Sequence, residues 1–72
     1  MHMTLDLRMT WRDGSETRNS RSCPRHLLPR IGDEIRVDAE GARAAGKVVA
    51  VGWDMEDPWT VRIGLVDVHY VG

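Results

Sequence analysis

The feature that most constrains this chain is a pair of β-prone runs around a short acidic segment, within residues 47–68. Both runs are rich in Val, Ile, Trp and Thr, and residues 54–58 between them are acidic and end in proline. Two such runs around a polar connection are typical of a β-hairpin. Pro58 has no amide hydrogen for a strand ladder, so it belongs in the loop or at the first position of the returning strand.

The alternation of apolar side chains also predicts the register of this hairpin. Successive side chains of a strand point to opposite faces, and a slip of one residue would turn one run away from the other. After Leu65 the apolar positions change from odd to even numbers, which predicts a bulge or bend within residues 64–67. The predicted pairs are Trp53 with Trp59, Val51 with Val61 and Val49 with Ile63.

The preceding residues supply two further strands and one long polar segment. Residues 3–11 alternate between apolar and polar side chains, as expected for an antiparallel strand with one wet face. Residues 15–30 show no convincing period, so we predict a long arginine-rich loop after the first strand. The alternative is that residues 16–19 continue a hairpin with that strand. Residues 34–37 alternate again, and residues 38–46 are predicted to be a connection.

Size and composition indicate one small domain spanning residues 1–72. Cys23 is the single cysteine and no signal-like or membrane-spanning apolar run occurs, so we expect a cytoplasmic protein without a membrane partner. The net charge is −1, and nine of the ten basic residues are arginine, which favours a GC-rich bacterial or phage origin. The predicted core is Leu5, Leu7, Met9, Ile35, Val37, Val49, Val51, Val61, Ile63 and Leu65.

A pattern of Gly, Asp and β-branched residues links three of these segments. It runs through residues 31–37 (IGDEIRV), 46–51 (GKVVAV) and 59–63 (WTVRI). This rhythm resembles that of SH3-like small β-barrels, a superfamily that includes KOW and Tudor modules. The resemblance covers about residues 29–68 and implies an all-β barrel of about five antiparallel strands. It also implies a binding module for peptides, nucleic acids or proteins rather than an enzyme. The aromatic ligand cages of the superfamily do not map onto this chain residue by residue.

Two groups of residues are candidates for binding. Residues 17–26 hold no acidic residue, and guanidinium forks on such a loop can clamp phosphate bidentately. An ordinary solvated loop is the competing interpretation. The candidate phosphate or nucleic-acid residues are Arg18, Arg21, Arg25 and His26.

The second group is the tip of the central hairpin. Its carboxylates are too few and too closely spaced for a calcium loop, so no metal is assigned. Aromatic and Met side chains beside an acidic turn suit a protein-docking edge, although both tryptophans could instead close one end of the barrel. The candidate docking residues are Trp53, Asp54, Met55, Glu56 and Trp59.

The function expected from these observations is protein–protein interaction by a small accessory or regulatory module. Recognition of nucleic acid or a phosphorylated ligand by the arginine loop is the alternative. We expect no catalytic residues and no cofactor, because no glycine-rich phosphate loop, catalytic triad or paired carboxylates can be identified. An open strand edge would also allow a second copy of the chain to bind, so a homo-oligomer is a further alternative.

Overall fold

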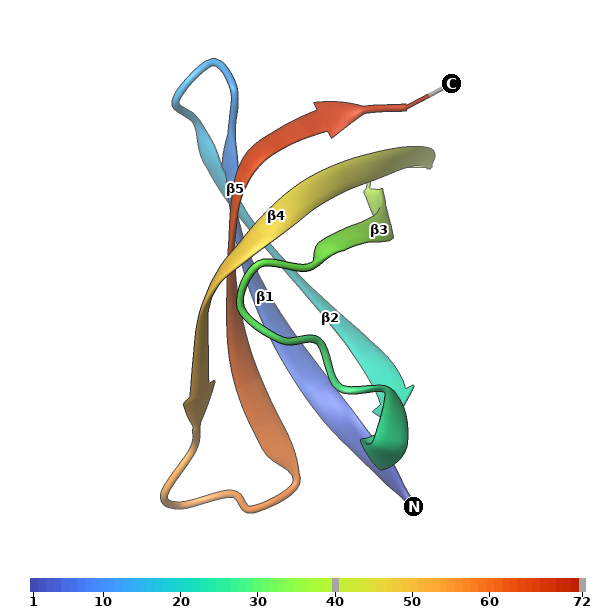
Figure 1. Cartoon of the computed structure of the whole chain (residues 1–72), viewed down its shortest axis with the longest axis vertical. Helices are drawn as coiled ribbons and strands as arrows, with labels where there is room; N and C mark the ends of the chain where they lie inside the picture. Colours follow the sequence, from blue (N-terminus) through green and yellow to red (C-terminus); the bar gives the residue numbers. More distant parts are fainter. Residues whose placement is uncertain (40, 72) are drawn as a thin grey trace.

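The chain forms a single curled sheet, seen in a computed structural model that describes residues 1–39 and 41–71. The five strands follow the order β2-β1-β5-β4-β3 and curl into a half-barrel whose inner face holds the core (Figure 1). The all-β class and the number of strands are as predicted. The elements are β1 (His2–Trp11), β2 (Glu16–Pro24), the 3-10 turn η1 (Arg25–Leu27), β3 (Glu34–Ala39), β4 (Ala42–Trp53) and β5 (Thr60–Tyr70).

The sheet is mixed, which corrects the prediction of purely antiparallel strands. β1 pairs in parallel with β5, and the other three pairings are antiparallel. The five strands alternate in direction along the chain, so the first and the fifth run the same way. When they become neighbours, their ladder must therefore be parallel. The barrel is left open between β2 and β3.

The opening between β2 and β3 is bridged by side chains. The Asn19 side-chain amide donates to the backbone carbonyl of Asp38 (2.7 Å), and an Arg21 guanidinium nitrogen donates to that of Arg36 (3.1 Å). These bonds satisfy carbonyls that a neighbouring strand would otherwise use. Polar side chains on β2 thus join the two edge strands of the half-barrel.

β1 is the half-buried strand with one wet face that the alternating pattern predicted. Its inward residues Met3, Leu5, Leu7 and Met9 are all buried. They pack against inward residues of β3, β4 and β5 to form one core. Of the predicted core, Ile35 is half-buried, Val49 and Val51 are exposed, and the remaining residues are buried.

The placement of Val49 and Val51 in the core was wrong. Val49 is 45% exposed and Val51 is 36% exposed. β3 begins opposite Lys47, so the second half of β4 has no strand on its outer side. A shift in register next to Val49 also breaks the alternation of β4. The hairpin itself is confirmed, but Val51 pairs with Ile63, two residues from the predicted partner.

The predicted bulge in the returning strand is confirmed at Asp67. This residue has a φ of 55°, and the register of β5 shifts there against both β1 and β4. The extra residue allows Leu65 and Val68 to face the core together. The Arg12 Nε lies 2.6 Å from the Asp67 Oδ1, an ion pair that fixes the bulge from the adjacent turn.

Two segments predicted to be loops are strands. Residues 16–24 form β2, so the hairpin alternative for residues 16–19 is correct and extends further. Its inward side chains are polar or half-buried because β2 is an edge strand, and they carry no apolar period. Residues 42–46 belong to β4, where small buried side chains hid the strand pattern.

Candidate functional site

The tip of the β4–β5 hairpin, at the lower end of the molecule in Figure 1, carries three large and exposed apolar side chains. Trp53 is 54% exposed, Met55 96% and Trp59 50%. Together with Pro58 they line a cavity of about 410 Å³. We call this the tryptophan cavity, and its lining is Met3, Arg25, Trp53, Asp54, Met55, Pro58 and Trp59.

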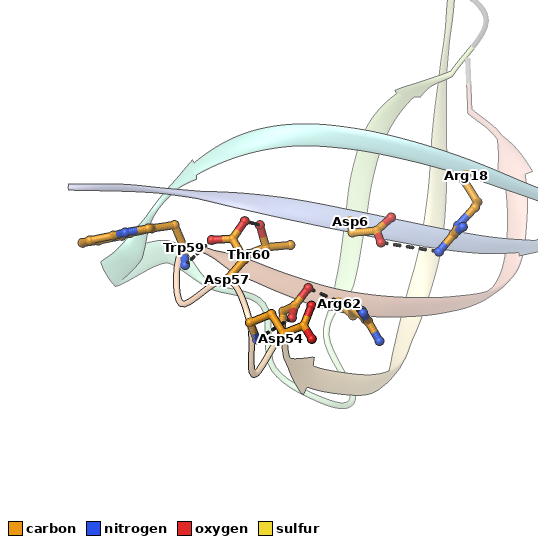
Figure 2. Close-up of polar contacts among 8 residues, drawn as sticks. Asp6, Arg18, Asp54, Asp57, Trp59, Thr60 and Arg62 are labelled. Atoms are coloured by element: carbon orange, nitrogen blue, oxygen red, sulfur yellow. Dashed lines mark hydrogen bonds and ion pairs between the residues drawn. The ribbon is translucent and has the colours of Figure 1, made fainter.

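The loop that presents the tryptophans is held by its own carboxylates. Asp57 accepts hydrogen bonds from the backbone amide of Trp59 (3.0 Å) and from the Thr60 hydroxyl (2.7 Å). Asp54 accepts one from the backbone amide of Glu56 (2.9 Å). Figure 2 shows the Asp57 carboxylate turned toward Thr60, with the Trp59 indole projecting away from both. The loop is therefore organised before any partner arrives.

The same bonds alter the titration of Asp57. The Thr60 hydroxyl, followed by the Trp59 amide, holds the pKa of the Asp57 carboxyl below its ordinary value of 3.8. The charged carboxylate is the better hydrogen-bond acceptor, and these donors favour it. Asp57 thus stays ionised while it shapes the turn.

The acidic residues of the tip do not form a metal centre. Asp54 points toward Arg62, with its Oδ2 3.5 Å from the Arg62 Nη2, whereas Asp57 faces its own loop (Figure 2). Among residues 1–39 and 41–71, no group of three or more His, Cys, Asp or Glu side chains is placed to hold a metal ion.

Arg25 reaches the tryptophan cavity from a distant part of the chain. η1 follows β2 directly, and the backbone amide of Arg25 donates to the carbonyl of Met1 (3.2 Å). This contact fixes η1 against the start of β1, at the same end of the barrel as the hairpin tip (Figure 1). Sequence reasoning placed Arg25 in a different site, because only the strand register shows that β2 ends beside the tryptophans.

The four residues of the predicted phosphate loop are not brought together. Arg18 and Arg21 lie on opposite faces of β2, because they are three positions apart and successive side chains of a strand alternate between its faces. Arg21 bonds to β3, Arg25 lines the tryptophan cavity, and His26 is exposed on η1. The predicted docking residues, in contrast, all lie at the tip of the β4–β5 hairpin, and four of the five, all except Glu56, line one cavity.

Comparisons of the chain with protein-family models, with curated proteins and with solved structures found no match. In the part of the chain that the structure describes, no helix has the length and apolar character needed to cross a bilayer. A functional proposal for this half-barrel therefore rests on its own geometry.

Proposed function

We propose that the chain is a small SH3-like, non-enzymatic module that binds a protein partner through the tryptophan cavity. The single observation that carries this proposal is the exposure of Trp53, Met55 and Trp59 around one hollow. Trp and Met are enriched where proteins meet, and Trp is a frequent source of binding energy. A cavity of about 410 Å³ matches the size of ordinary ligand pockets.

The charges around the cavity define the partner's chemistry. Asp54 and Arg25 are the charged residues of the cavity lining, and Glu56 and Asp57 lie on the same loop outside the lining. The loop beside the apolar cavity is therefore acidic overall. A matching segment presents one aromatic or aliphatic anchor with lysine or arginine beside it. Since the Asp57 hydrogen bonds already fix the loop, little ordering entropy is lost when the partner binds.

Peptides selected from a random displayed library test this proposal. We expect the enriched peptides to share an apolar anchor next to a basic residue, and to change tryptophan emission when they bind. Trp59→Ala should weaken the selected peptide by about 30-fold, since truncation of a Trp hot spot costs about 2 kcal/mol. Ile31→Ala is the matched control, because Ile31 is also an exposed apolar residue but lies outside the cavity.

The salt dependence of the selected interaction also distinguishes protein docking from nucleic-acid binding. Apolar docking tolerates added salt, whereas binding to nucleic-acid phosphates weakens steeply. Failure to enrich any sequence, or equal loss of binding in the Trp59 and Ile31 variants, would refute docking at the tryptophan cavity.

A further inference from the structure

Three arginines from three neighbouring strands line one hollow on the outer face of the sheet. Arg8 of β1 lies directly opposite Arg18 of β2 in the ladder. Arg62 of β5 lies opposite Asp6, the residue two positions before Arg8 on the same face of β1. Strand register alone assembles this group, so nothing in the linear sequence indicated it.

The arginines stand around a hollow with a floor of small residues. Gly64 and Ala50 face each other across the β4–β5 ladder, and Gly52 lies opposite Arg62. A Cβ on Gly64 would approach the Ala50 Cβ to 3.1 Å, so even one added methyl group would crowd this floor. The resulting cavity is about 320 Å³, and Arg8, Arg18 and Arg62 all line it.

The hollow has more positive charge than its own carboxylates neutralise. Asp6 Oδ2 lies 3.5 Å from Arg18 Nη2, and Asp54 forms a similarly long pair with Arg62 (Figure 2). Charge-assisted hydrogen bonds are shorter, at about 2.8 Å, so these are loose pairs. No ion pair to Arg8 occurs among the residues that the structure describes.

The cross-strand pair of Arg8 and Arg18 is the decisive observation. Like charges directly opposite each other on adjacent strands are destabilising. An anion seated between the two guanidinium groups removes this repulsion and gains hydrogen bonds from both. Arg12 differs from these arginines because its guanidinium group already has a close partner. Its Nε lies 2.6 Å from the Asp67 carboxylate.

We propose that this hollow binds the phosphoryl group of a small molecule. Guanidinium forks match phosphate oxygens bidentately, and three of them suit a compact anion with a double charge. A nucleic-acid backbone needs an extended basic surface. Here Asp6 and Asp54 lie beside the arginines, and the chain has a net charge of −1. The site shares no arginine with the tryptophan cavity and does not rest on the protein-docking function.

Titration of the isotopically labelled chain with inorganic phosphate, AMP and ATP tests the site. The Nε–H signals of Arg8, Arg18 and Arg62 should shift and saturate with each ligand, and Arg12 should not respond. Arg8→Gln should weaken phosphate binding about tenfold, because a hydrogen bond to a charged group is worth about 1.5 kcal/mol or more. Arg12→Gln is the matched control and should bind like the wild-type chain.

Each other outcome overturns the proposal. Absence of a saturable shift with millimolar phosphate, or equal weakening by both substitutions, shows that the hollow is not a phosphoryl site. Binding of a single-stranded oligonucleotide without binding of phosphate or nucleotides would show that the ligand is a nucleic acid and not a small molecule. Thermal unfolding of Arg8→Gln checks its fold, and we expect an unchanged or higher melting temperature because a like-charge pair is removed.

Discussion

Gly46 is the position where one added methyl group should do the most damage. It is buried in β4, across from the Asp67 bulge of β5. A Cβ built on Gly46 would lie 2.8 Å from Val68 Cγ2 and 3.4 Å from the Val66 carbonyl oxygen. Nonbonded carbon atoms prefer a separation of about 3.5–4.0 Å, so Val68 or its strand must move by about 1 Å.

Gly46→Ala should therefore lower the free energy of unfolding by about 1–3 kcal/mol, the usual cost of overpacking a core. For a domain of this size each kcal/mol shifts the melting temperature by about 4–8 °C, so a fall of about 4–24 °C is expected. Thermal unfolding followed by circular dichroism measures it. Gly52→Ala is the control, since a Cβ on Gly52 meets nothing within 4 Å.

A double-mutant cycle identifies the cause of the loss. Val68→Ala removes the methyl group that Gly46→Ala would strike. The double variant should be more stable than the sum of the two single effects predicts, by about 1 kcal/mol, as is typical of residues in contact. A melting temperature of Gly46→Ala equal to that of the wild type, or strictly additive effects, would refute the reasoning.

Three further predictions concern the hairpin tip and the open seam. Because the pKa of Asp57 is lower in the folded chain, its stabilising effect is complete above the ordinary pKa of 3.8 and is lost as the pH falls through the folded pKa. Asp57→Asn should thus be less stable than the wild type at neutral pH and lose less stability below pH 3.8, as urea titrations at both pH values would show. Acrylamide should quench Trp53 and Trp59 readily and Trp11 poorly, because the first two are half-exposed and the third is partly buried against the tilted ring of Tyr70. Single-Trp variants that show equal quenching would contradict this. Asn19→Ala should raise amide exchange in β3 by removing a bond across the seam worth about 1 kcal/mol, and unchanged exchange would mean that the bond contributes little.

The alternation of apolar residues was sufficient to predict β1, the central hairpin and the bulge at Asp67. It failed for β2, because the inward side chains of that edge strand are polar and bond to β3 instead of filling a core. It also misplaced Val49 and Val51, since a pattern of side chains tells which face they share and not whether another strand covers that face.

The two candidate sites also differ in whether the sequence alone could group their residues. The tip residues from Trp53 to Trp59 are contiguous, so local sequence was enough to group them. Arg8, Arg18 and Arg62 become neighbours only through two ladders, one of them between strands from opposite ends of the chain. Only the three-dimensional arrangement of β2, β1 and β5 shows that group.

The parallel ladder of β1 with β5 has a consequence for how the protein is made. Leu7 and Ile63 are ladder partners, so the ribosome releases β1 long before it has synthesised the strand beside it. Until then the leucines and methionines of β1 have only the polar hairpin partner β2, which offers them little apolar cover. Contacts between residues so distant along a chain slow folding and prolong the exposure of apolar surface. Nascent copies are therefore most vulnerable to aggregation just before β5 is synthesised.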